Sequence, residues 1–119
     1  MTPQWTQDAV DGLRQLAEFV ATTPRGKPRM RVREVLDAVA ALRHTWDTYR
    51  VRRRVGGVEL RRLTTEHGTV VVFSREEDPA EPDGVILVRW VAQGNRLLQE
   101  PPRQHVRPAA QTPRAQPPR

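Results

Sequence analysis

Apolar residues recur at helical spacing in two stretches near the start of the chain. In residues 6–22, Thr6 and Asp8 supply the N-cap oxygen and the first-turn acid that favour a helix start. Residues 23–28 contain two prolines and a glycine, which break the pattern before it resumes from about residue 29 to residue 45. The spaced apolar positions are Val10, Leu13, Leu16, Ala17 and Val20, then Val32, Leu36, Val39 and Leu42. This spacing predicts two helices joined as a hairpin.

After Trp46 the apolar positions recur every second residue, which is the period of a β-strand. The extended stretches are residues 49–55, 58–61, 69–73 and 85–91. Two helices followed by several strands in succession are typical of the α+β class. We therefore predict an N-terminal helical hairpin packed on one face of a 3–4-stranded antiparallel sheet.

Residues 101–119 differ in composition from everything before them. They contain six prolines and four arginines and no acidic residue. Such a stretch buries too little apolar surface to offset the entropy lost on ordering. We predict one domain over residues 1–100, followed by a Pro/Arg-rich disordered tail over residues 101–119.

The composition excludes several classes of protein. There is no cysteine, and the three histidines are scattered, so we expect no metal and no cofactor. The longest apolar run is five residues, at 38–42, far below the roughly 20 that a membrane-spanning helix needs. We expect a cytoplasmic protein without a membrane partner.

The positive charge is concentrated in one part of the chain. The net charge is +6, and residues 25–62 carry +8 while the regions on either side are acidic. All the basic residues except Lys27 are arginines. A concentrated basic stretch suits a phosphate backbone or an acidic protein partner. The alternative is an arginine-rich surface without a specific ligand.

No standard catalytic motif accompanies this charge, so arginine is the main candidate for chemistry. Guanidinium groups bind phosphate in bidentate fashion and can stabilise a developing phosphorane. Tyr49 and His67 are candidates for proton transfer, although a tyrosine at the core edge and a histidine in a turn are common structural residues. The candidate nucleic-acid-binding arginines are Arg50, Arg52, Arg54 and Arg62, and the candidate catalytic residues are Arg61, Arg75, Arg89 and Tyr49.

Three motifs resemble the RelE/ParE superfamily of toxins from type II toxin–antitoxin modules. The sequence WTQDAVDGL at residues 5–13 is similar to the start of that family, with Gln7 where proline is common. The sequence GVELR at residues 57–61 is similar to a strand of the HigB-like, phage-derived branch. The sequence GVILVRWV at residues 84–91 is similar to the closing strand. Together with their spacing, the motifs extend the resemblance over residues 1–98.

The resemblance implies a fold, a partner and a target. The fold is a helical hairpin against a twisted antiparallel sheet, with a short first strand near residues 1–5. The partner is a cognate antitoxin that wraps the basic surface. RelE-like and HigB-like members cut mRNA on the ribosome, whereas ParE-like members inhibit DNA gyrase.

The sequence departs from the nuclease pattern at the final strand. Gln93 and Asn95 stand where histidine or tyrosine is common, while Arg61 and Arg89 match the basic positions of the family and Arg75 matches more loosely. Three hypotheses stay open: an mRNA endonuclease (mRNA interferase), a non-enzymatic gyrase inhibitor, and an inactive member that only binds a partner.

Overall fold

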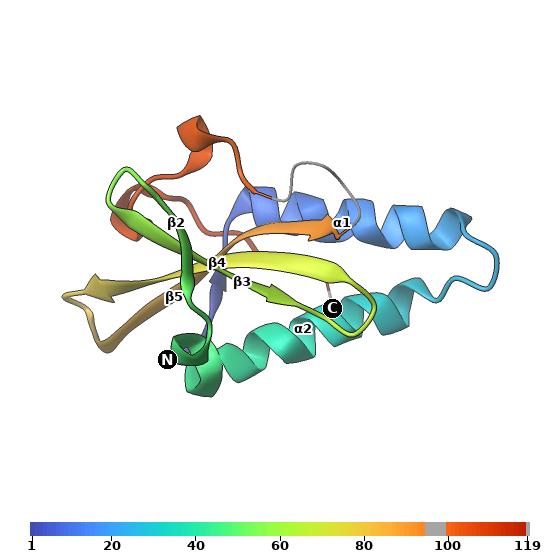
Figure 1. The fold of residues 1–119 in the computed structure, drawn as a ribbon, viewed down its shortest axis with the longest axis horizontal. Coiled ribbons are helices and arrows are strands. Elements are labelled where there is room, and N and C mark those ends of the chain that lie inside the picture. The colour runs from blue at the N-terminus through green and yellow to red at the C-terminus, as the bar shows by residue number, and fades with distance from the viewer. Residues whose placement is uncertain (95–99, 119) are drawn as a thin grey trace.

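The computed structural model describes residues 1–94 and 100–118. Two helices, α1 (Gln7–Thr22) and α2 (Pro28–Thr45), form a hairpin along one face of a five-stranded sheet (Figure 1). The strands are β1 (Gln4–Trp5), β2 (Val51–Val55), β3 (Val58–Thr64), β4 (Thr69–Asp78) and β5 (Glu81–Gln93). Short 3-10 helices follow α2, at η1 (Trp46–Thr48), and lie near the C-terminus, at η2 (Arg103–His105) and η3 (Ala109–Gln111). The predicted α+β class is confirmed.

The sheet has the strand order β1-β5-β4-β3-β2, and every neighbouring pair is antiparallel except β1 with β5. The fifth strand is β1, which is two residues long and places Gln4 opposite Leu87. It corresponds to the short first strand that the family resemblance implies. β4 and β5 extend through the acidic stretch between Asp78 and Asp83, and only residues 79–80 connect them.

The helices follow the predicted boundaries for local reasons. Thr6 caps α1, and its hydroxyl oxygen accepts a hydrogen bond of 3.1 Å from the Ala9 amide. Gly12 lets α1 lie directly against β5, because a Cβ at this position would overlap the Val91 carbonyl oxygen. Apolar side chains of both helices then pack on the face of the sheet that contains Phe73 and Val88, which we call the helix face.

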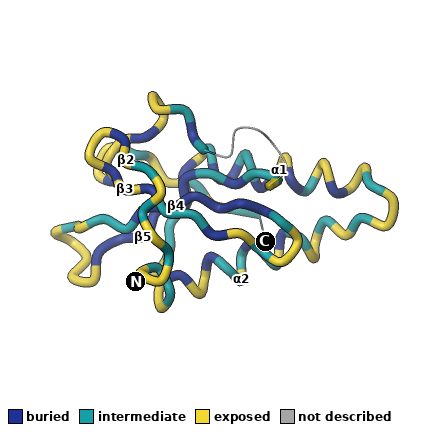
Figure 2. The backbone as a smooth tube through the Cα atoms, in the orientation of Figure 1, coloured by how far each residue is buried: buried dark blue, intermediate teal, exposed yellow. Residues whose placement is uncertain are grey.

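The opposite face of the sheet is also buried (Figure 2). Its apolar residues are Val55, Val58, Leu60, Val70, Val72, Val85 and Leu87. Residues 100–118 begin on this face, where Val106 and Ala109 each retain 6% exposure, and continue past Trp5 to the two helices. We call these residues the strap and this surface the strap face.

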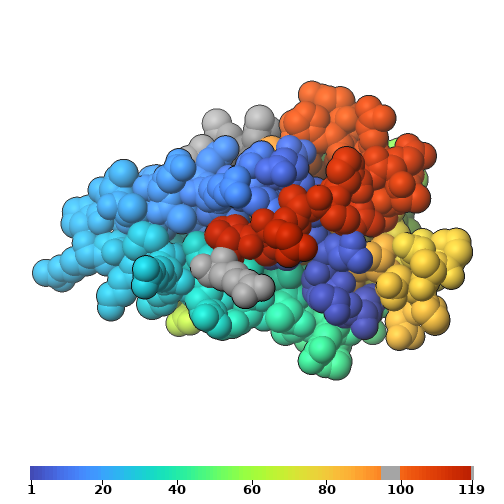
Figure 3. All heavy atoms as spheres, turned by 180° about the vertical axis from the view of Figure 1, so that it is seen from behind, coloured from blue at the N-terminus to red at the C-terminus, as the bar shows by residue number. Residues whose placement is uncertain are grey.

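The expected disordered tail over residues 101–119 therefore differs from the structure, in which the strap packs on the sheet. The physical reason is that β4 and β5 are apolar on both faces, and the two helices can cover only one of them. In Figure 3 the strap crosses the N-terminal residues on its way to the two helices. Arg119 lies outside the described residues.

Candidate functional site

Three of the four predicted catalytic residues meet at one end of the helix face. These residues surround Trp46, and we call the group the Trp46 cluster. Its members are Trp46, Tyr49, Arg61 and Arg75. The guanidinium carbons of Arg61 and Arg75 each lie 5.0 Å from the centroid of the Trp46 ring. Both distances are within the range of a cation–π interaction. The sheet order explains the convergence, because Arg61 lies on β3 and Arg75 on the neighbouring β4.

The Trp46 cluster is anchored to the core and to nearby carbonyl groups. The Tyr49 ring packs edge-on against Phe73, with ring centroids 5.8 Å apart. Arg61 Nη1 donates a hydrogen bond to the Tyr49 carbonyl oxygen. These contacts hold Arg61 in place and leave this residue half-buried beside the Trp46 indole.

Arg75 is held from the other side by the β4–β5 hairpin. Its Nη2 donates to the Asp83 carbonyl oxygen at 2.7 Å, and its Nη1 pairs with Glu77. Gly84 has a φ of +83°, and a Cβ there would lie 2.7 Å from the Arg75 guanidinium. A glycine is required at this position both for the backbone angle and for the space that Arg75 occupies.

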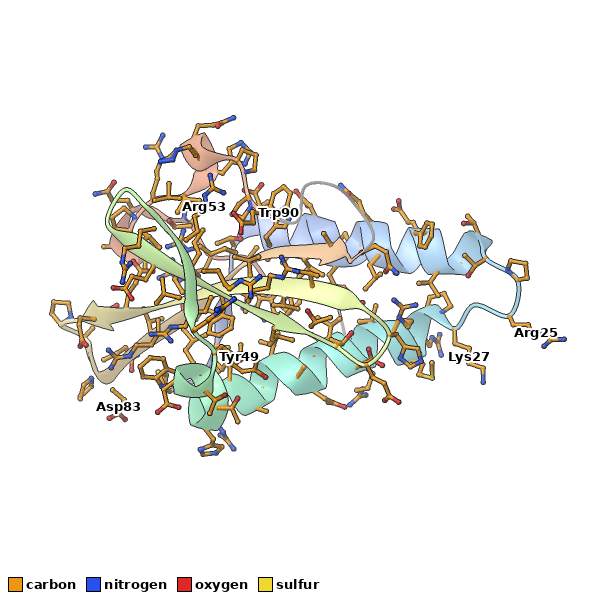
Figure 4. All side chains as sticks on the ribbon, viewed as in Figure 1. Arg25, Lys27, Tyr49, Arg53, Asp83 and Trp90 are labelled. Atoms are coloured by element: carbon orange, nitrogen blue, oxygen red, sulfur yellow. The ribbon has the colours of Figure 1, made fainter. Side chains whose placement is uncertain are left out.

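A surface cavity of about 540 Å³ opens beside Trp46 and Arg75. The end of α2 contributes Arg43 and His44 to its lining, and the β4–β5 hairpin contributes Asp83. Figure 4 labels Tyr49 and Asp83 at this end of the molecule. Sequence reasoning missed Arg43 and His44. The available signal was their position in the last turn of the predicted helix, directly before Trp46.

Arg89 lies apart from the Trp46 cluster, on the strap face. Its side chain is 2% exposed, and its Nη2 lies 2.9 Å from Glu76 Oε2. Its Nε donates to Ser74 Oγ at 2.9 Å. Burial lowers the pKa of Arg89, while Glu76 opposes this shift and the nearby charge of Arg114 adds to it. The sheet therefore separates Arg89 from Arg61 and Arg75.

Three of the four predicted nucleic-acid-binding arginines lie along the β2 edge of the sheet, and Arg62 lies on the neighbouring β3. Arg50, Arg52 and Arg54 are exposed, and Arg54 forms a loose ion pair with Glu59 at 3.6 Å. Arg62 is half-buried and points to the strap face, since neighbouring residues in a strand alternate between faces. These side chains form a basic edge that is separate from the cavity.

The remaining predicted residues are His67, a candidate for proton transfer, and Gln93 and Asn95, which stand where nucleases of the family have histidine or tyrosine. His67 Nδ1 pairs with Glu34, which ties the β3–β4 turn to α2. Gln93 accepts a hydrogen bond of 3.1 Å from Arg31, and Asn95 lies outside the described residues. Within residues 1–94 and 100–118, no three acidic or histidine side chains are placed to hold a metal ion together. The helices in these same ranges are too short or too polar to cross a membrane.

Comparison with known proteins gives one likeness of fold. No protein-family model matches the chain, and no curated protein matches it. A solved structure described as a chromosomal ParDE TA system from P. aeruginosa is similar to this chain, with a TM-score of 0.59 and 21% sequence identity. The similarity covers 78% of this chain and 95% of the other. It confirms the fold that the sequence motifs implied.

Proposed function

We propose that this chain is the toxin component of a type II toxin–antitoxin module, which inhibits growth until a cognate antitoxin binds it. The observation that carries this proposal is the fold likeness, which spans 95% of a chain from a ParDE toxin–antitoxin structure. The motifs at residues 5–13, 57–61 and 84–91 fall on β1 and α1, on β3 with its turn, and on β5. Sequence and fold therefore favour the same class of protein by separate routes.

The site favours a toxin that acts by binding its target, with DNA gyrase as the target. Arg89 is buried and neutralised by Glu76, and the sheet divides it from Arg61 and Arg75. Because the sheet lies between them, the three arginines do not surround a single phosphate. Binding to a protein target needs no proton-transfer group, and the exposed arginines of β2 and the aromatic Trp46 cluster suit a protein interface.

One observation favours a second candidate, ribosome-dependent cleavage of mRNA. The cavity beside Trp46 brings an imidazole, from His44, next to the guanidiniums of Arg43 and Arg75. An imidazole can transfer the proton of a ribose hydroxyl, and the guanidiniums can stabilise the charged transition state. In this candidate Trp46 and Tyr49 position the RNA strand.

Induction in a bacterial host, with pulse-labelled DNA and protein synthesis, tests both candidates. We expect growth to stop, with an early fall in DNA synthesis and filamentation if gyrase is the target. An early fall in protein synthesis would favour mRNA cleavage instead. Normal growth, with the folded protein present at a high level, would contradict the toxin proposal.

The variant His44→Gln separates the candidates further. Loss of a general acid or base costs about 10²–10⁴-fold in rate, so mRNA cleavage would be abolished while gyrase inhibition would persist. His105→Gln is the matched control, because His105 is also exposed but lies on the strap. In parallel, Arg75→Ala should reduce toxicity in either candidate. Arg14→Ala, at an exposed position on α1, should leave toxicity unchanged.

A further inference from the structure

On the strap face, two small apolar side chains of the strap, three residues apart, pack into the domain. Val106 packs among Val55, Val58 and Leu60, and Ala109 packs against Val85 and Leu87. The backbone amide of Ala109 donates a hydrogen bond of 2.8 Å to Glu76 Oε1. The strap face therefore presents two apolar sites, and a carboxylate acceptor at the second of them, to any segment that lies on it.

The edge of the sheet and the helices continue this surface beyond the strap face. The Ala115 amide donates to the Trp5 carbonyl oxygen at 2.8 Å, so the strap pairs with the free edge of β1 (Figure 3). Pro118 then reaches a groove of about 580 Å³ between α1 and α2, whose apolar lining includes Ala17, Val32 and Leu36. The whole path suits a long extended chain segment.

The strap is held by few backbone contacts. Between residues 1–94 and residues 100–118, the bond from Ala115 to Trp5 is the single hydrogen bond that joins two backbone groups. Six of the strap residues are prolines, which have no backbone N–H to donate. An occupant held mainly by side chains can leave without disrupting the strand pairing of the sheet.

The domain matches the charges of the strap only in part, and one match is His105, whose Nδ1 lies 2.9 Å from Asp8 Oδ2 of α1. Among the described residues, no acidic side chain pairs with Arg103, Arg107 or Arg114. By contrast, Glu100 at the start of the strap forms a 2.7 Å ion pair with Arg53 of β2. On the neighbouring strand β3, Arg62 also points to the strap face. An acidic segment on the same surface would form ion pairs with these basic residues of the domain, which the arginines of the strap do not form.

We propose that the strap occupies in cis a docking surface for an extended acidic segment of a partner protein, which displaces the strap when it binds. The partner segment carries two small apolar residues three positions apart, for the sites of Val106 and Ala109. It also carries carboxylates for Arg53 and Arg62, which lie on the strap face. This inference rests on the proposed function, because the partner that such a surface serves is the cognate antitoxin.

Three synthetic peptides and the full-length chain test this proposal. The native peptide has the sequence of residues 100–118. The acidic peptide carries R103E, R107E and R114E, and the blocked peptide adds V106D and A109D to those changes. Binding is measured by fluorescence anisotropy, and displacement by hydrogen exchange of the amides of Val106, Ala109 and Ala115 in the protein.

We expect the acidic peptide to bind about tenfold or more tightly than the native peptide at low salt. Its binding should increase exchange at the three strap amides, and the blocked peptide should not bind. The advantage of the acidic peptide should shrink at about 0.5 M salt, because exposed charges are then screened. Equal binding of the native and acidic peptides, no binding, or binding without strap exchange would each overturn the proposal.

A full-length variant removes the cis competitor. Ala109→Glu places a charge in the apolar site and should release the strap, so that the acidic peptide binds the variant more tightly than the original chain. If this variant fails to fold, Val106→Ala gives a milder release of the same kind, and tighter peptide binding is expected for it as well. Unchanged affinity in a folded variant would contradict competition between strap and peptide.

Two further results would assign the surface to another occupant and so reject the acidic partner. One is strap release by an RNA oligonucleotide in place of the peptide. The other is exchange of straps between two copies, detected as a dimer by light scattering. These measurements on purified protein are separate from the growth assay. If the chain is not toxic but releases its strap when the acidic peptide binds, only the proposed function is rejected. If the chain is toxic but retains its strap in the presence of the peptide, only this inference is rejected.

Discussion

The two faces of the sheet are both buried, but by different means. On the helix face, two amphipathic helices bring large side chains such as Leu13 and Leu42 against Phe73. On the strap face, a proline-rich segment contributes only Val106 and Ala109 to the apolar contacts. The first cover is built from two long helices, whereas the second is a single irregular segment with only two short 3-10 helices.

This difference indicates that the two covers have different roles. A helix satisfies its own backbone groups and can bury a large area, so the helix face should supply most of the free energy of unfolding. The strap satisfies few of its backbone groups on the domain and buries little, so its removal should leave a folded domain. The predictions below test this division, beginning with the largest expected effect.

Truncation of the central aromatic side chain on the helix face should cost the most. Phe73 is fully buried, so Phe73→Ala should reduce the free energy of unfolding by about 3–5 kcal/mol, measured by urea denaturation. Phe19 is the matched control, because it is 42% exposed and its replacement by alanine should have little effect. A loss below about 1 kcal/mol for Phe73→Ala would contradict the dominant role of the helix face.

The buried ion pair gives the next largest effect, on the strap face. Arg89→Met keeps an apolar stem but leaves Glu76 without its charged partner, so we expect a loss of about 3 kcal/mol in thermal unfolding. Adding Glu76→Leu should recover most of this loss, because an apolar pair replaces the buried charges.

The exposed pair of Arg54 with Glu59 is the control for this measurement. Their side chains are 70% and 46% exposed, so Arg54→Ala should have almost no effect on unfolding. If Arg54→Ala and Arg89→Met reduced the free energy of unfolding equally, burial of the pair between Arg89 and Glu76 would not explain its contribution to stability.

The sequence predicted those parts of the fold that local pattern decides. The spacing from Val10 to Val20 and from Val32 to Leu42 placed both helices, and Gly68, with a φ of +80°, lies in the predicted turn before β4. The strap escaped prediction because its composition describes an isolated segment. Its order depends on a sheet face that lies far away in sequence.

The candidate site was predicted in part for a similar reason. Alternation along a strand places Arg61 on the helix face and Arg62 on the strap face, and pairing of β3 with β4 brings Arg75 beside Arg61. The position of Arg89 could not be derived in this way, because β5 has a bulge between the partners of Val72 and Phe73. The bulge turns Arg89 toward Glu76.

A mutation in the strap should have a moderate effect. Val106→Ala removes two buried methyl groups, so we expect a loss of about 1–2 kcal/mol if the strap unfolds together with the domain. If the strap instead opens alone, trypsin should cut faster after Arg103 and Arg114 while the urea midpoint barely changes. We expect this second pattern, measured by limited proteolysis of the folded protein.

Thr112→Ala is the matched control within the strap. Its hydroxyl donates only to strap carbonyls, so its loss should not change the contact with the sheet. Faster cleavage in Thr112→Ala than in Val106→Ala would show that internal turns of the strap, not its contact with the sheet, hold it in place.

The smallest effect concerns a polar link on the helix side of the molecule. Burial alone would raise the pKa of Glu34, but hydrogen bonds from Thr65 and His67 outweigh it and lower that pKa below its ordinary value. A carboxyl group whose pKa is lowered by folding stabilises the protein above its unfolded pKa, and the contribution is lost as the pH falls through the folded value. Glu34→Gln should therefore cost on the order of 0.5 kcal/mol at pH 7 and almost nothing near pH 3, measured by urea denaturation at both values.

Asp37 provides the control for this pH dependence, because it lies exposed on the same helix without an ion-pair partner among the described residues. Asp37→Asn should show no comparable change between pH 7 and pH 3. If Glu34→Gln instead lost the same stability at both values, the link between α2 and the β3–β4 turn would depend on the shape of the side chain and not on its charge. The pH comparison thus separates an electrostatic tie from simple packing, which the size of the effect alone does not.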